Sequence, residues 1–201
     1  MRTIGRTGII TLSILAVVVL LGGTCVATYN KLVRLDQAAK AQWAQVENAY
    51  QRRADLIPNL VETVKGAAAF EHDTIVAVTE ARSRVGQVST KDVTANAEAF
   101  GKYQQAQDQL GASLSRLIAV SEAYPTLTAT QNFRDLQAQL EGTENRITVE
   151  RMRYNETARD FDTARASFPT SIVAGVFGGK FADKAYFAAK AGADEPPKVK
   201  F

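Results

Sequence analysis

Three consecutive residues have side chains that could bind a metal ion or exchange protons: Glu71, His72 and Asp73. Consecutive residues of a helix point about 100° apart, so these three cannot converge on one ion if the segment is helical. His72 shares a helical stripe with Ala68 and Ile75, which predicts a half-buried, hydrogen-bonded histidine. The chain contains 1 His and 1 Cys, which excludes sites built from several such ligands. We expect no metal and no cofactor.

Other catalytic arrangements are also missing from the sequence. The serines lie in no nucleophile elbow and have no second histidine as a base, and no glycine-rich phosphate loop follows a predicted strand. The Glu-x-x-His motif of di-iron helical proteins is absent. A net charge of +3 over 201 residues is too close to balance to indicate nucleic acid as a partner. The sequence therefore predicts a protein that is not an enzyme.

The elements that must position the remaining residues are helices. The 5 prolines leave long uninterrupted segments, which favours a helical protein. We predict an all-α fold of four long antiparallel helices over 29–53, 55–85, 92–123 and 127–167. Apolar residues of the first helix recur at a period near 3.5, with Asp36 as the one break. They are Tyr29, Leu32, Ala39, Trp43, Val46 and Tyr50.

Pro58 stands inside an otherwise helical run and removes one backbone hydrogen bond there. We expect the chain to turn at this point and begin a new helix, with Asp55 as N-cap and Pro58 in the first turn, next to Asn59. Arg53 would then lie at the end of the preceding helix, where the helix dipole favours positive charge. The alternative is a kinked but continuous helix.

The N-terminal run from Ile9 to Ala27 contains no charged residue and is just long enough to cross a bilayer. We expect an uncleaved transmembrane helix within residues 1–28. The alternatives are a signal peptide cleaved after Ala27 and, on a weaker match, a lipoprotein modified at Cys25. Apolar residues that would face lipid include Ile9, Leu12, Leu15, Val18, Leu21 and Val26.

The orientation of this span follows from the basic residues around it. Arg2 and Arg6 precede the span, and Lys31, Arg34 and Lys40 follow it, so the positive-inside comparison is nearly balanced. The short basic head resembles that of an exported protein. We expect a single pass through the membrane, with the body outside the cytoplasm.

The segment 169–201 differs in composition from the helices before it. Its apolar run 172–177 is too short to cross a membrane. One interpretation is a C-terminal strap that folds back over the helices, and the other is an exposed patch for a subunit, a partner or the bilayer interface. Its aromatic residues are Phe177, Phe181, Tyr186 and Phe187.

Charged residues of the last long helix repeat at i,i+3 spacing, which indicates a solvated face that needs no partner. These pairs are Glu150 with Arg153, Glu156 with Arg159, and Asp162 with Arg165.

Several motifs point to a known family. The segment 52–66 contains the run Asp55-Leu56-Ile57-Pro58-Asn59-Leu60-Val61. Shorter motifs are spread over 29–187: Tyr29-Asn30, Trp43, Val46, Ala81-Arg82, Tyr124-Pro125, Phe133, Leu136, Leu140, Thr143-Glu144, Ile147, Arg153-Tyr154-Asn155, Phe168-Pro169 and Tyr186-Phe187. Together they resemble the LemA family. The stretch 67–70 departs from the tyrosine-containing pattern of that family.

The resemblance implies a bacterial membrane-anchored protein with a short N-terminal span and an antiparallel four-helix bundle. With the orientation expected above, the span would cross the inner membrane and the body would lie on the periplasmic side. Members are associated with membranes, some with membrane remodelling such as magnetosome formation, and some occur beside membrane metalloproteases. The family has no established catalytic residues, so the resemblance implies none here.

We therefore expect three parts: a membrane anchor (1–28), a helical bundle (29–168) and a strap with a polar tail (169–201). The predicted function is a scaffold that self-associates or organises partners at the membrane, with the bilayer and further copies of the chain as partners. An adaptor for a membrane protease or another envelope protein is the alternative, and a hydrolase with an unrecognised polar pocket is a third hypothesis. Two motifs, Tyr29-Asn30 and Tyr154-Asn155, would form a polar layer if they met at one end of the bundle. The alternative, which we favour, is that these residues only cap and pack the helices.

Overall fold

The structure is a computed structural model that describes residues 6–66, 71–88 and 93–188. The predicted all-α class is confirmed, and no strand occurs within these ranges. The long helices are α1 (Arg6–Lys65), α2 (His72–Gln87), α3 (Ala97–Ser121) and α5 (Gln131–Ala166). The short ones are η1 (Val93–Ala95), α4 (Pro125–Thr128), α6 (Thr170–Val176) and η2 (Gly178–Lys180).

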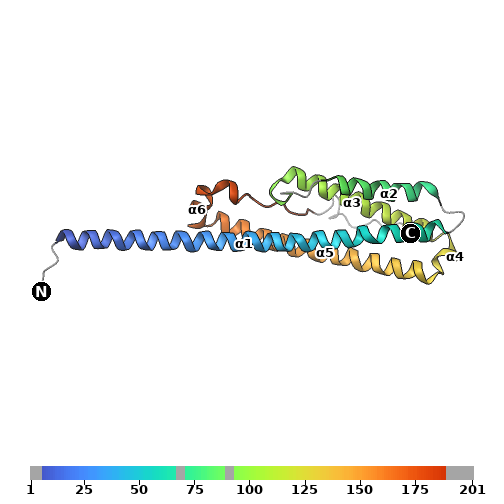
Figure 1. The fold of residues 1–201 in the computed structure, drawn as a ribbon, viewed down its shortest axis with the longest axis horizontal. Coiled ribbons are helices and arrows are strands. Elements are labelled where there is room, and N and C mark those ends of the chain that lie inside the picture. The colour runs from blue at the N-terminus through green and yellow to red at the C-terminus, as the bar shows by residue number, and fades with distance from the viewer. Residues whose placement is uncertain (1–5, 67–70, 89–92, 189–201) are drawn as a thin grey trace, which may run out of the picture.

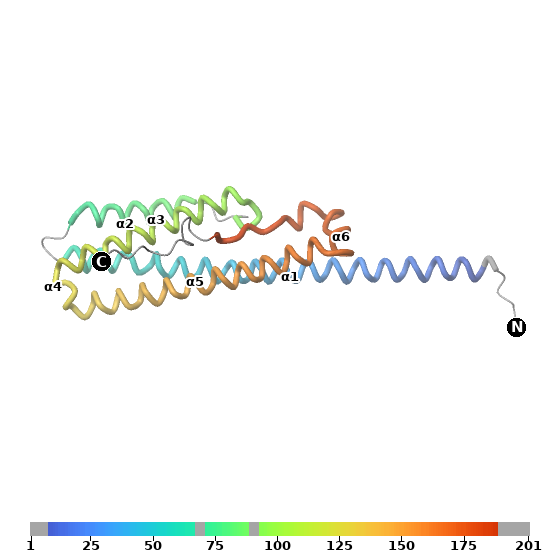
Figure 2. The backbone as a smooth tube through the Cα atoms, turned by 180° about the vertical axis from the view of Figure 1, so that it is seen from behind, coloured from blue at the N-terminus to red at the C-terminus, as the bar shows by residue number. Residues whose placement is uncertain are grey.

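Helix α1 is the axis of the molecule. Its C-terminal half packs along α5, while α2 and α3 form a second pair on the other side of α1 (Figure 1). The N-terminal part of α1 extends alone beyond all other helices, as the view from behind also shows (Figure 2). From Tyr29 onward α1 is about 55 Å long, as are the 36 residues of α5. Residues 29–65 therefore belong to the body and the residues before them project from it.

The predicted turn at Pro58 is wrong, because α1 continues through this residue to Lys65. Buried residues keep one heptad spacing on both sides of the proline, which itself lies exposed. A turn would break this register. The buried positions that follow this spacing are Leu32, Asp36, Ala39, Trp43, Val46, Tyr50, Arg53, Ile57, Leu60 and Val64.

A side chain from α2 compensates for the hydrogen bond that Pro58 cannot make. The missing N–H would have bonded the carbonyl of Ala54, four residues earlier. Arg82 Nε donates to this carbonyl oxygen at 3.1 Å. The proline is therefore accommodated within a continuous helix, as the alternative interpretation expected.

The boundaries of the other helices follow local capping. The predicted second helix begins at His72 and not at residue 55, so the chain reverses after Gly66. The family-divergent stretch 67–70 lies outside the described residues. The Asn96 side chain accepts hydrogen bonds from the backbone N–H groups of Glu98 and Ala99, which fixes the start of α3. The Thr130 side chain caps α5 in the same way.

The core is divided into three clusters along α1. The cluster farthest from the N-terminus contains aliphatic residues of α1, α2, α3 and α5, among them Ile57, Leu60, Leu114 and Leu140. The middle cluster is mainly aromatic, and the third surrounds Leu32, Phe161 and Phe181 near the projecting part of α1.

Two parts of the segment after α5 differ in exposure. Residues 181–188 run without regular structure along the helices, with Phe181 and Phe187 buried. Phe168, Ile172 and Val176, around α6, are exposed.

Candidate functional site

The projecting part of α1 is the most distinctive surface of the molecule. The six residues expected to face lipid are each more than half exposed, with values between 56% and 64%. An 18-residue window here has a mean hydropathy of 2.6, and none of it is buried. Among the described helices, one is therefore long and apolar enough to cross a membrane. The six residues are Ile9, Leu12, Leu15, Val18, Leu21 and Val26.

A buried ion pair connects α1 to the C-terminal segment. The Lys184 ammonium donates to Asp36 Oδ1 at 2.6 Å and lies 4.8 Å from the centre of the Phe161 ring. Lys40 pairs with Asp36 Oδ2 at 2.7 Å. Burial opposes the charged form of Asp36, but the hydrogen bonds and attraction from Lys184 and Lys40 outweigh it and lower the pKa of this carboxyl. Asp36, which interrupts the apolar stripe of α1, therefore binds the C-terminal segment to this helix.

In the middle core cluster, the Tyr154-Asn155 motif meets the Tyr186-Phe187 motif of the C-terminal segment. Tyr154 packs against Trp43, with ring centres 5.3 Å apart, and its hydroxyl donates to the carbonyl of Ala185 at 3.0 Å. Asn155 exchanges two hydrogen bonds with the backbone of Phe187, both at 2.9 Å. Burial raises the pKa of the Tyr154 hydroxyl. These two residues therefore hold the C-terminal segment on the helices.

Tyr29-Asn30 and Tyr154-Asn155 do not meet in one polar layer. Tyr29 lies in the cluster with Phe181, at a ring distance of 5.6 Å, and Asn30 is exposed. Tyr154 lies in the middle cluster, about 20 Å farther along the axis, because its partner Trp43 follows Tyr29 by about four turns of α1.

The polar residues of the motif around Pro58 face solvent, while its aliphatic residues Ile57 and Leu60 are buried. Asp55 is not an N-cap; its carboxylate accepts from Gln51 Nε2 at 2.7 Å within the same helix. Asn59 is exposed, and its backbone carbonyl accepts from the Thr63 hydroxyl at 2.8 Å.

Arg53 was expected at a helix end but is buried in the middle of α1 with 3% of its surface exposed. Its guanidinium donates to the Gln107 side chain at 2.7 Å and to Glu144 at 2.9 Å. Gln107 in turn donates to the Tyr103 hydroxyl at 3.1 Å. The regular heptad spacing from Val46 to Arg53 is the signal that could have identified this buried position.

Tyr50 and Arg151 form a second contact beside Arg53. Arg151 Nε donates to the Tyr50 hydroxyl at 2.6 Å, and its other end pairs with Asp108 at 3.0 Å. Burial raises the pKa of Tyr50 to about 12. A cavity of about 240 Å³ adjoins these groups and is bordered by Arg53, Asp108 and Glu144.

Charged residues of α5 contact other segments of the chain, which their i,i+3 spacing did not indicate. Glu150 is buried and accepts from Gln42 on α1 at 2.7 Å, in addition to its pair with Arg153. Asp162 accepts hydrogen bonds from the Lys184 backbone and the Tyr186 hydroxyl. For these residues the prediction of a solvated face is wrong, because other segments of the chain cover them.

His72 is the first residue of α2 and is exposed, so the prediction that it is half-buried is wrong. The preceding carboxylate, Glu71, accepts from the Thr74 hydroxyl at 3.1 Å. No group of three or more His, Cys, Asp or Glu side chains in the part of the chain that the structure describes could hold a metal ion.

Comparison with known proteins assigns the family. The sequence profile of the LemA family matches residues 42–201. This chain belongs to the LemA family. Two similar relatives are the magnetosome proteins MamQ 2 and MamQ 1 of Paramagnetospirillum magneticum, each 26% identical over 215 residues, covering 97% of this chain and 78% of the relative. The magnetosome protein MamQ of Magnetospirillum gryphiswaldense is 26% identical over 190 residues, covering 86% of this chain and 69% of the relative.

The LemA match and the exposed apolar helix together indicate a membrane-associated helical protein. The match begins within α1, after the projecting part, so the apolar helix is an observation independent of it.

Proposed function

We propose that this LemA-family chain is a single-pass, non-enzymatic scaffold of the bacterial envelope that associates with further copies of itself. The projecting apolar part of α1 is the observation that supports this most directly. It is unburied, and it continues as one helix into the core of the body. Such a helix lies in lipid more favourably than in water.

The unbroken course of α1 favours an anchor that stays attached over a cleaved signal peptide. Cys25, Val26 and Ala27, the residues of the weak cleavage site, lie inside the helix. We further propose that α1, α2, α3 and α5 act as an antiparallel four-helix bundle and that residues 181–188 are its strap.

A scaffold is favoured over an enzyme by how the polar side chains are used. Arg53, Asp36 and Glu150 each make contacts between segments of the chain. The relatives named as magnetosome proteins support a role in organising a cell structure.

The mass of the protein extracted in detergent or lipid nanodiscs tests self-association. We expect the full chain to form a large assembly and a shortened chain beginning at Tyr29 to be monomeric, because the span would contribute to the contacts. Monomers in both cases would contradict the scaffold and favour an adaptor for a membrane protease or another envelope enzyme.

Labelling of an engineered cysteine tests the proposed periplasmic position of the body. Gln139 is exposed on α5. In a Cys25→Ser background, Gln139→Cys should react with a membrane-impermeant maleimide once the outer membrane alone is permeabilised. Reaction only after lysis of the inner membrane would place the body in the cytoplasm.

A further inference from the structure

Helix α6 is apolar on two roughly opposite sides. Val173 and Ala174 are buried against the body. On the other side Ile172 and Val176, one turn apart, are 60% and 76% exposed, and Phe168 just before the helix is 83% exposed. A helix that faces water usually presents polar residues there, so this exposed side indicates a surface that covers it.

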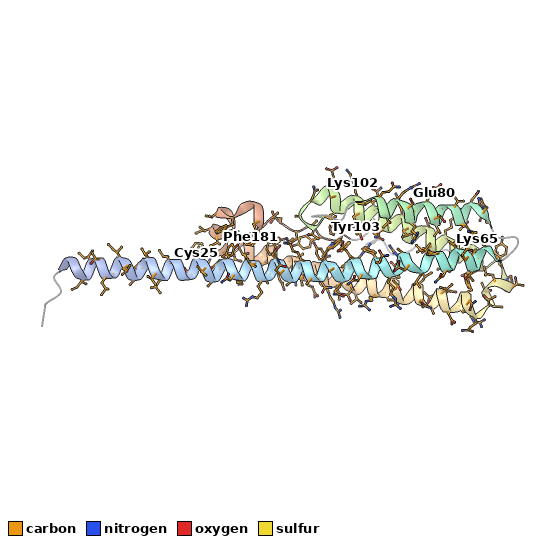
Figure 3. All side chains as sticks on the ribbon, viewed as in Figure 1. Cys25, Lys65, Glu80, Lys102, Tyr103 and Phe181 are labelled. Carbon is orange, nitrogen blue, oxygen red and sulfur yellow. The ribbon has the colours of Figure 1, made fainter. Side chains whose placement is uncertain are left out.

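The exposed side of α6 lies at the end of the predicted span. Helix α6 packs on α1 and α5, and the Phe177 ring that follows it lies 5.0 Å from the Tyr29 ring. Tyr29 comes two residues after Ala27, the last residue of the uncharged run. Figure 3 shows Cys25 and Phe181 at neighbouring levels along the axis of α1.

The charges at this level match those of a membrane interface. The Lys180 ammonium lies 4.9 Å from the centre of the Tyr29 ring and donates to its hydroxyl. Lys31 and Arg34 are exposed on the next turns of α1. The carboxylate of Asp183 is paired with Arg165. Tyrosine and basic residues are enriched where helices leave the bilayer, and anionic headgroups attract such basic groups.

We propose that Phe168, Ile172 and Val176 form a second membrane contact, inserting into the leaflet at which the α1 span ends. This inference rests on the proposed membrane anchoring. Lipid is the occupant that fits, because α6 packs on α1 at Tyr29, just after the large exposed apolar residues of α1, the last of which is Val26 at 61% exposed. The body would then be held to the bilayer at two points, the span of α1 and the exposed side of α6.

Quenching of an added tryptophan by lipids with brominated acyl chains tests this contact in the full chain. The native Trp43 is 6% exposed in the body and gives a constant background. Three variants are compared in phosphatidylcholine–phosphatidylglycerol vesicles: Ile172→Trp, Val18→Trp in the span, and Met152→Trp on α5. Met152 is the matched control, since it is 57% exposed and lies about 20 Å from the end of α5 that contacts α6.

We expect brominated lipid to quench the added fluorescence of Val18→Trp and Ile172→Trp. For Met152→Trp, we expect no more quenching than the native Trp43 shows alone. Interfacial insertion by about 5–10 Å would bring the added ring of Ile172→Trp to the upper part of the brominated acyl chains. Quenching of Val18→Trp alone would overturn the second contact and leave the anchor intact. No quenching of Val18→Trp would overturn the anchor itself.

If a second copy of the chain covered α6, the quenching of the added tryptophan would differ. Ile172→Trp would then be shielded from aqueous iodide but not quenched by brominated lipid, which also overturns the proposal. Matching circular dichroism spectra and unfolding transitions confirm that the three variants are folded.

Discussion

At the scale of single residues, the polar positions inside the core decide how the segments are joined. Asp36 and Lys184 are separated by 148 residues in the sequence, yet their charged ends meet at 2.6 Å with both residues buried. Removing one partner of such a pair leaves an uncompensated charge, which is far more costly than replacing both with apolar residues. The pair therefore specifies where the C-terminal segment docks on α1.

Lys184→Met should destabilise the fold by less than the about 3–5 kcal/mol of an uncompensated buried charge, because Asp36 loses its buried partner but keeps its pair with Lys40. The double variant Asp36→Leu/Lys184→Met should recover most of this loss, since leucine continues the apolar stripe. Urea unfolding of the single and double variants measures both effects. Equal stability of the two would show that the pair does not act as a unit.

The same pair predicts the acid dependence of stability. Because the folded state lowers the pKa of Asp36 below its ordinary value of 3.8, the fold binds fewer protons at this group than the unfolded chain does. Its contribution is present above that pH and is lost as the pH falls through the folded-state pKa. Urea unfolding from pH 7 down to pH 2 should show an acid loss that is smaller in the double variant.

Asn155→Ala should release the C-terminal segment, because it removes both hydrogen bonds to the backbone of Phe187. We expect a loss of about 1–3 kcal/mol and faster hydrogen exchange at the Phe187 amide. Asn59→Ala is the control, since Asn59 is exposed and should change stability by no more than about 0.5 kcal/mol. Unchanged exchange at Phe187 would contradict this role of Asn155.

At the scale of elements, the continuity of α1 across Pro58 depends on a neighbour. Arg82→Ala should cost about 0.5–1.5 kcal/mol, because it leaves the Ala54 carbonyl without its donor from α2. In a Pro58→Ala background the cost should be smaller, since the new backbone N–H can bond this carbonyl. A double-mutant cycle by urea unfolding measures the difference, and equal costs in both backgrounds would contradict the compensation.

The helical class and the exposed span follow from periodicity and composition, which act locally and are visible in one sequence. The position of the first reversal was not predictable in this way, because proline predicts a helix boundary when only the backbone is considered. What maintains α1 is tertiary: the heptad register through Tyr50 and Ile57, and the donor from Arg82. Contacts such as Asp162 with Tyr186 also depend on the return of the chain, which i,i+3 spacing does not show.

At the scale of the whole molecule, α1 joins the predicted span to the body without a flexible connection. Thr28, between the two parts, lies within the helix, and neither proline nor a break follows until Pro58. A rigid helix transmits the direction of the span to the body. If the axis stands along the membrane normal, the body should reach about 55 Å from the bilayer surface.

Neutron reflectometry of the full chain in a supported bilayer measures this height. Thr28→Pro should give a thinner and broader protein layer, because proline removes a backbone hydrogen bond and kinks the helix where it leaves the bilayer. Lys40→Pro would disturb the body and is therefore unsuitable as a control. Ile10 is an exposed residue of the predicted span, and Ile10→Leu should leave the layer unchanged. An unchanged layer in Thr28→Pro would mean that the direction of the body is set by the contact of α6 with the membrane and not by α1.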